Sequence, residues 1–372
     1  MKLHTANKYL SSLPRKSEKG LVARFDALRE ATLTAVGADT ALTVLLTVSG
    51  EEHSFVCRAA MAALAHAGYN AALISLDPEA PLEEMVHIGK NAVSDDEAAQ
   101  VATAVRQAAV SLGITPTLIE AKLLCALALC SRKGCKNVIV GFDPMNIPHA
   151  FYDIFPSART VALLPSEASV SESSYIVRKG VLEVISAPRG EEEYRAISAV
   201  CAKVNCRHSV ISRSAVASPT LTYKGIEFLY KDRKYAMRGH SESMIAEAVA
   251  AILAARALER RGFKISEGDV GAILPDVAVE YGCRIVSYNP CVIALVCRNG
   301  RPSPQIRSDA ERVCANFDKP LRLFSEFSGD AELEGAFGSC YSGECALCVE
   351  GTPHFVRDTL NALEGWISPP VK

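Results

Sequence analysis

The chain has 372 residues, 49% of them hydrophobic and only 6% aromatic. A chain of that length is too long to fold around a single hydrophobic core, so we predict two or three domains. Lys and Arg number 40 against 42 Asp and Glu, which leaves a net charge of -2 without a dense basic run. This balance argues against a broad nucleic-acid surface, because such a surface needs a basic stripe.

Targeting and redox signals favour the cytoplasm. The first 13 residues are polar and amphipathic, with no apolar segment before a cleavage site. No stretch reaches the roughly 18–20 apolar residues that span a bilayer, so we expect no membrane partner. The 13 cysteines are an odd number in a long chain, and several lie within apolar runs. We therefore expect buried thiols in a reducing compartment.

The first part of the chain reads as an alternation of helices and strands. Thr5–Leu13 and Lys19–Val36 have helical patterns, and the apolar run Ala41–Val48 is typical of a buried parallel strand. A helix ending at Gly68 and a strand at Ala71–Ser75 follow. This order predicts a βαβ unit and a doubly wound α/β sheet.

The middle of the chain continues this pattern and then becomes antiparallel. Ser94 and Glu97 have capping-box spacing for a helix within Asn91–Val110. Further helices are expected at Thr117–Ser131, Glu191–Val204 and Ser241–Arg260. Strands are expected at Asn137–Gly141, Thr160–Leu164 and Val181–Ser186, and hairpin strands at Leu221–Tyr223, Ile226–Tyr230 and Lys234–Met237.

A linker composition at Asn299–Pro304 predicts a domain boundary near residue 300. The predicted domains are therefore 1–300 and 301–372. Strands at Ile285–Ser287 and Val292–Cys297 precede the boundary. The predicted elements beyond it are helices Ser308–Asn316 and Phe355–Leu363 and strands Leu321–Phe324 and Cys345–Val349.

Several segments in this order resemble the folylpolyglutamate synthase and dihydrofolate synthase family of the Mur ligase superfamily. They are Val48–Gly50 leading into a helix that closes at Ala67–Tyr69, Val86–Gly89 (VHIG) with Val93–Glu97 (VSDDE), Pro116–Ala121 (PTLIEA), and Ile176–Val181 (IVRKGV) with Val184–Pro188 (VISAP). The resemblance covers residues 1–300 and is weaker beyond. It implies a Mur-ligase-like, doubly wound P-loop-type central domain with a smaller α/β C-terminal domain.

The resemblance also implies a reaction. Members of this family use ATP and magnesium to convert a carboxylate into an acyl phosphate, which an amine attacks. A glycine-rich loop at a helix N-terminus and a lysine hold the phosphates in such sites. Carboxylates or neutral oxygens hold the magnesium.

The corresponding loop here is Gly50–Val56 (GEEHSFV), which has no lysine and carries two glutamates. One close charge pair is worth about 4 kcal/mol at an effective dielectric near 20, so these glutamates disfavour a triphosphate. The family's other glycine-rich, histidine and lysine positions are also replaced, for example by Val140–Met145 and Leu295–Gly300. The remaining candidates for nucleotide contact are Gly50, Ser54 and Asn299, and no catalytic residue is assigned.

Glu120 matches the family's magnesium-associated glutamate. The alternative is structural, because Thr117 and Glu120 also have capping-box spacing at a helix N-terminus. A single carboxylate makes a poor magnesium site.

Two further sets of residues need interpretation. Cys340, Cys345 and Cys348 have the spacing of an iron–sulfur loop, which needs a fourth cysteine, and none follows Cys348. Cys314 could supply the fourth ligand only if the fold brought it close, and buried side chains are the simpler interpretation. His240 lies where the family begins a helix with a histidine, and we interpret it as an ordinary helix-end residue.

The sequence therefore predicts a folylpolyglutamate-synthase-like protein that has lost the P-loop and catalytic residues. Its expected role is non-catalytic binding or regulation, with no cofactor and with a small molecule or a protein as partner. The alternative is an active ATP-dependent ligase that adds glutamate to a folate and uses ATP and magnesium. A third hypothesis, a thiol- or metal-dependent function, rests on the C-terminal cysteines.

Overall fold

The computed structural model describes residues 2–15, 21–37, 42–50, 53–78, 80–89, 91–147, 158–164, 175–188, 190–212, 215–222, 224–279, 282–297, 304–315, 317–327 and 332–367. The chain divides into two units, and the division falls within two helices. The first unit is Met1–Ile211 with Ala250–Val270, and the second is Ser212–Val249 with Gly271–Lys372.

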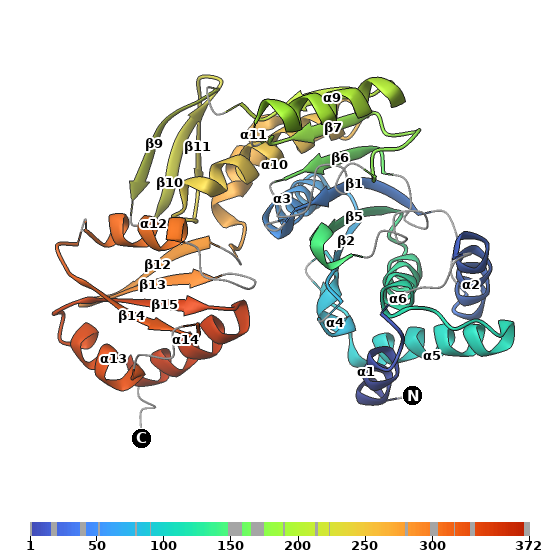
Figure 1. Ribbon diagram of the computed structural model, residues 1–372, viewed down its shortest axis with the longest axis horizontal. Coiled ribbons are helices and arrows are strands. Elements are labelled where there is room, and N and C mark those ends of the chain that lie inside the picture. The colour runs from blue at the N-terminus through green and yellow to red at the C-terminus, as the bar shows by residue number, and fades with distance from the viewer. Residues whose placement is uncertain are drawn as a thin grey trace. The chain divides into compact units, whose positions relative to one another are not determined.

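An eight-stranded sheet, in the order β4-β3-β2-β5-β1-β6-β7-β8, forms the centre of the first unit (Figure 1). All neighbouring pairs from β2 to β8 are parallel, and β3 and β4 pair antiparallel at one edge. The strands are β1 (Thr43–Ser49), β2 (Ala71–Leu76), β3 (Val86–Ile88), β4 (Asn91–Ala92), β5 (Asn137–Phe142), β6 (Thr160–Leu163), β7 (Glu183–Ser186) and β8 (Arg207–Val210). The expected doubly wound sheet is confirmed.

Helices cover both faces of this sheet. The helices are α1 (Leu3–Ser11), α2 (Leu21–Ala35), α3 (His53–His66), α4 (Leu82–Met85), α5 (Asp95–Leu112), α6 (Leu118–Arg132) and α9 (Glu191–Val204), with a 3-10 turn, η1, at Pro144–Asn146. The large core cluster joins α1, α2, α5, α6 and α9 to alternate strand residues such as Ile74 and Val140. Helix α3 packs on the opposite face, against Gly141.

The remaining helical segments lie where the chain passes between the two units. They are the 3-10 turn η3 (Glu242–Met244), α10 (Ile245–Glu259), α11 (Glu267–Ile273) and η4 (Leu274–Asp276). The alanine-rich run from Ser241 therefore starts as a 3-10 turn before it becomes an α-helix.

The second unit contains two smaller sheets. Strands β9 (Val216–Thr222), β10 (Gly225–Tyr230) and β11 (Arg233–Met237) form an antiparallel sheet, as the hairpin pattern predicts. The other sheet has the order β12-β13-β15-β14 and is parallel except for the pair of β12 and β13. Its strands are β12 (Gly282–Tyr288), β13 (Cys291–Cys297), β14 (Leu321–Ser325) and β15 (Ala346–Gly351).

Three helices cover the mixed sheet: α12 (Pro304–Ala315), α13 (Leu333–Tyr341) and α14 (Pro353–Ile367). Helix α12 packs on one face, and α13 and α14 pack on the other. Strands β12 and β13 precede residue 300 yet share this sheet with β14 and β15. The boundary at residue 300 lies outside the described residues and stays a prediction.

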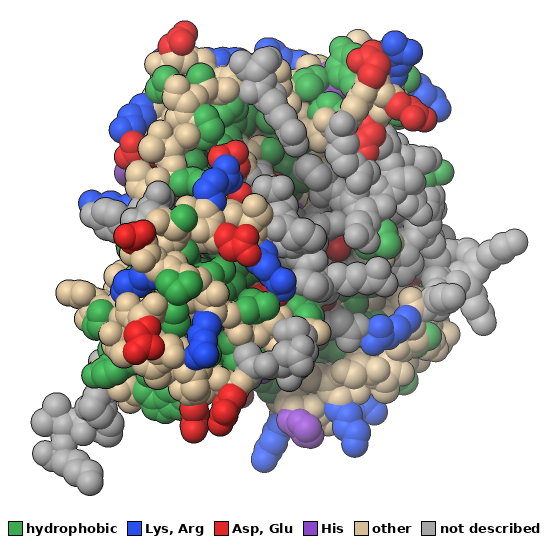
Figure 2. Space-filling model, turned by 60° about the vertical axis from the view of Figure 1, so that its left-hand side comes forward, with side chains coloured by type: hydrophobic (Ala, Val, Ile, Leu, Met, Phe, Trp, Pro, Cys, Tyr) green, Lys and Arg blue, Asp and Glu red, His purple; other side chains and the backbone are tan. Residues whose placement is uncertain are grey.

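Charged side chains of both signs are interspersed on the described surface that Figure 2 shows. No helix in the described part of the chain is long and apolar enough to cross a bilayer.

Candidate functional site

The turn after β1 brings the backbone close to β6. The strand ends at Ser49, and Gly50 follows with a φ of 155°. A Cβ at Gly50 would lie 2.6 Å from the Cβ of Leu164, so no other residue fits there without movement. Glu51 and Glu52 lie outside the described residues, and α3 begins at His53.

The imidazole of His53 lies at the N-terminus of α3. Its Nδ1 is 2.9 Å from the carbonyl oxygen of Gly50, and its Nε2 is 3.3 Å from Oγ of Ser75. Since a carbonyl only accepts, Nδ1 carries the proton and Nε2 accepts from Ser75. The ring also lies against Gly141, where an added Cβ would be 2.5 Å from Cδ2 of His53.

This position matters because three parallel strands end around the imidazole. Gly50 follows β1, Ser75 lies near the end of β2, and Gly141 lies near the end of β5. The carboxyl ends of parallel strands together with a helix N-terminus form the usual phosphate site of such sheets. Here a side chain that is only 7% exposed occupies that place.

Of the other predicted nucleotide contacts, the structure describes Ser54 and not Asn299. Ser54 lies in the first turn of α3 and is also 7% exposed, so its hydroxyl is hardly open to solvent. Asn299 lies outside the described residues. The assignments of Gly50, Ser54 and Asn299 to nucleotide binding stay predictions.

Glu120 caps its own helix. Its carboxylate accepts from the backbone N–H of Thr117 at 2.5 Å, and its own N–H donates to Oγ1 of Thr117 at 3.4 Å. The capping interpretation is therefore confirmed, and the side chain is 5% exposed. Within the described residues no group of three or more His, Cys, Asp or Glu could hold a metal ion. The metal assignment of Glu120 stays a prediction.

The C-terminal cysteines do not converge on one point. Cys340 and Cys345 belong to the core on the α13 and α14 face of the mixed sheet, whereas Cys348 and Cys314 belong to the core on the α12 face. Burial raises the pKa of the Cys348 thiol and raises that of Cys314 to about 11. Thiols on opposite faces of one sheet cannot ligate one cluster.

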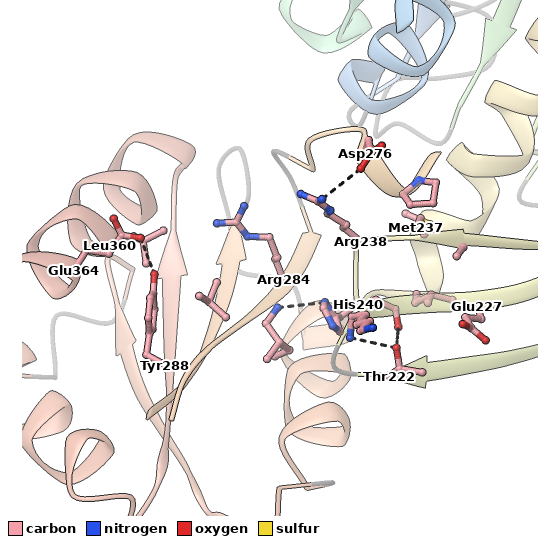
Figure 3. Close-up of a pocket in the computed structure, with 17 residues that line it drawn as sticks. Thr222, Glu227, Met237, Arg238, His240, Asp276, Arg284, Tyr288, Leu360 and Glu364 are labelled. Atoms are coloured by element: carbon pink, nitrogen blue, oxygen red, sulfur yellow. Dashed lines mark hydrogen bonds and ion pairs between the residues drawn. The ribbon is translucent and has the colours of Figure 1, made fainter. Parts of the chain in front are cut away.

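A pocket of about 660 Å³ lies in the second unit (Figure 3). Its walls come from the β9–β10 turn, β10, β11, β12, η4 and the last turns of α14. Its volume is within the roughly 300–1,000 Å³ of typical small-molecule sites. No family motif and no local sequence pattern indicates this pocket, because its walls are far apart in the chain.

All three acidic side chains that line this pocket have partners. Arg238 and Asp276 form an ion pair at 3.4 Å, and Glu227 pairs with Lys234 at 2.6 Å. The hydroxyl of Tyr288 donates to Oε1 of Glu364 at 2.6 Å. Burial, with added contributions from Glu364, raises the pKa of Tyr288 to about 12, so this phenol stays a donor at neutral pH.

His240 is a buried part of the pocket wall, 1% exposed, and it precedes η3. Its backbone N–H donates to the carbonyl of Cys283 at 2.7 Å, and its Nδ1 accepts from the N–H of Ile285 at 3.2 Å. Because Nδ1 accepts, Nε2 carries the proton of the neutral ring. His240 therefore anchors β12 to the pocket, which its interpretation as an ordinary helix-end residue did not anticipate.

The first unit has a doubly wound sheet and the second has a smaller mixed sheet, with helices packed on both. This is the fold of folylpolyglutamate synthases, so the predicted resemblance is confirmed for the fold. The Lactobacillus casei folylpolyglutamate synthetase is 12% identical, with a TM-score of 0.75, and the alignment covers 98% of this chain and 100% of that one.

Two further solved structures share the fold. Thermotoga maritima folylpolyglutamate synthase is 15% identical with a TM-score of 0.72, covering 97% of this chain and 96% of that one. Escherichia coli FolC, in a complex with DHPP and ADP, is 15% identical with a TM-score of 0.65, covering 99% of each chain. No protein-family model matches the sequence. No curated protein matches it either.

Proposed function

We propose that this chain is a folylpolyglutamate-synthase-like protein that does not carry out ATP-dependent ligation and acts as a binding or regulatory protein. The observation that carries the proposal is the imidazole of His53 at the N-terminus of α3, bonded to Gly50 and packed against Gly141. A phosphate that approached this helix end would have to displace a buried, hydrogen-bonded ring.

The chemistry of the loop supports the same proposal. A triphosphate needs backbone donors and a cation, and the loop Gly50–Val56 has two glutamates and no lysine. The carboxylate of Glu120 is engaged in a helix cap, which leaves it less suited to magnesium. The proposed protein therefore needs neither ATP nor magnesium.

We place the protein in the cytoplasm, where thiols stay reduced. All 13 cysteines are free, and 12 of them are buried. That usage agrees with a reducing compartment. Its proposed partner is a small molecule or another protein, and neither a nucleic acid nor a membrane.

The test is thermal unfolding with and without millimolar magnesium-ATP, together with calorimetric titration. A ligand at 100 times its dissociation constant adds about 2.7 kcal/mol to the stability of the folded state, which raises the midpoint by a few degrees. We expect no shift and no heat. An active folylpolyglutamate synthase, assayed in parallel, is the positive control.

The alternative is an active ATP-dependent ligase that adds glutamate to a folate. Its support is the shared fold, since similar structures include complexes with AMPPCP and with ADP. It requires a cation close to the phosphates, and Arg58 on α3 is the candidate within the described residues. A magnesium-ATP-dependent shift followed by glutamate addition to a folate would replace the proposal with this alternative.

A further inference from the structure

The pocket of the second unit has an extensive apolar wall. Its apolar members are Ile226, Ala236, Met237, Pro275, Ile285, Val286 and Leu360. Ile226 and Met237 are almost fully buried beneath it. Such a wall favours a ligand with an apolar body, because removal of that body from water is favourable in proportion to the apolar surface that it buries.

Arg284 is the distinctive polar group in this pocket. It lies on β12, and among the described residues its guanidinium makes no hydrogen bond or ion pair, in contrast to Arg238 and Tyr288. Figure 3 shows its side chain between Arg238 on one side and Leu360 on the other. A half-buried guanidinium offers five fixed donors and binds carboxylates in a bidentate manner.

The charges of the pocket limit the charge of its ligand. Three lining residues are cationic (Lys224, Arg238 and Arg284), and three are acidic (Glu227, Asp276 and Glu364). The charges of the lining balance, so it has no surplus of positive charge to compensate the several negative charges of a polyphosphate. A ligand with one negative charge needs one cation, and Arg284 supplies it.

We propose that this pocket binds a small organic acid with one carboxylate and an apolar body, and that Arg284 recognises the carboxylate. This inference rests on the proposed function, because it names a ligand class for a binding protein. The apolar body lies against Ile226, Met237 and Leu360. Tyr288 and Glu364, joined by a hydrogen bond, line the pocket on the α14 side.

The experiment uses the full chain and two probes, octanoate and 4-phenylbutyrate, in calorimetric titration and ligand-observed NMR. The matched neutral probes are octanamide and 4-phenylbutyramide, which keep the apolar body and remove the charge. We expect at least one acid to bind saturably at one site, and its amide to bind about 10- to 100-fold more weakly, as loss of a charge-assisted hydrogen bond predicts.

Variants locate the binding site. Arg284→Gln is expected to weaken binding of the acid by about 10- to 100-fold and to leave the affinity for the amide unchanged. Arg357→Gln is the matched control, because Arg357 is exposed on α14 and does not line the pocket. Circular dichroism and the unfolding midpoint establish that both variants are folded.

Three results would overturn the inference: neither acid binds, acid and amide bind equally, or Arg284→Gln binds the acid as the unaltered chain does. None of them affects the magnesium-ATP test. Nucleotide binding with no acid binding would overturn both proposals. No binding of either kind would overturn only the ligand class.

Discussion

The ring of His53 and the backbone of Gly141 are in direct contact across the interface between α3 and the sheet. A Cβ at residue 141 would lie 2.5 Å from Cδ2 of His53 and 2.6 Å from Sγ of Cys57. Glycine is therefore required at this point of β5, because a parallel strand and a helix approach each other too closely for any side chain. The same contact holds the imidazole at the strand ends.

Gly141→Ala is expected to destabilise the protein by about 1–3 kcal/mol, as overpacking of a buried site does. Denaturant unfolding followed by circular dichroism measures the change. The control is Gly190→Ser, since Gly190 is the N-cap of α9 and has open space around it. Serine is a preferred N-cap, so this control should be neutral or slightly stabilising. Equal stability of G141A and the unaltered chain would contradict the close contact.

Thr117→Ala is expected to cost about 1 kcal/mol of stability, because it removes the cap of α6. Thr115→Ala is the matched control, since Thr115 is exposed and makes no side-chain hydrogen bond among those described. Thermal unfolding compares the two variants. If the two midpoints fall equally, the capping box does not stabilise the helix.

Asp309→Ala is expected to destabilise the second unit by about 1–3 kcal/mol. Its buried carboxylate accepts from Oγ of Ser241 at 2.7 Å and from Nη2 of Arg312 at 2.5 Å, so its removal breaks two hydrogen bonds, one of them to a buried hydroxyl. Differential scanning calorimetry measures the loss. Glu311→Ala, an exposed change on the same helix, should leave the transition in place, and a similar effect of both changes would refute this role of Asp309.

The stability of the protein should depend on pH in the acid range through the carboxyl group of Glu97. A hydrogen bond from Lys133, followed by bonds from Ser94, lowers the pKa of this carboxyl from 4.5 to about 2. Because this pKa is lowered in the folded state, the contribution of Glu97 to the free energy of unfolding is present above pH 4.5. It is lost as the pH falls toward 2. The difference in unfolding midpoint between the unaltered chain and Glu97→Gln should therefore shrink over that range.

Glu192→Gln serves as the control for this titration, since Glu192 is exposed in the first turn of α9. This change removes one carboxylate and leaves the contacts of Glu97 with Lys133 and Ser94 in place. If the difference in unfolding midpoint between Glu97→Gln and the unaltered chain stays constant across the same pH range, the ion pair with Lys133 does not contribute to stability.

Local signals in the sequence predicted much of this fold. The capping boxes of Ser94 with Glu97 and of Thr117 with Glu120 are present, and the helix Glu191–Val204 has the predicted bounds. Each depends on residues three or four positions apart. The sequence does not indicate strands β3 and β4, because two or three residues carry no periodicity. It places Asn91 and Ala92 in a helix, whereas in the structure they form β4 and the helix begins at Asp95.

Spacing alone could not place the cysteines or the pocket. Cys345 and Cys348 are three residues apart, yet they lie on opposite faces of one sheet, because side chains alternate along a strand. Arg284 and Glu364 are 80 positions apart and line the same cavity. No periodicity connects residues at that separation.

The sequence alone was sufficient for the order of helices and strands, the resemblance to the fold of folylpolyglutamate synthases and the absence of a lysine from residues 50–56, since each is a local property of neighbouring residues. The fold was needed to place His53 over Gly141 and to leave Arg284 open to a pocket. These outcomes depend on packing between segments distant along the chain, where a shift of a few ångströms determines whether a side chain is buried, bonded or available to a ligand.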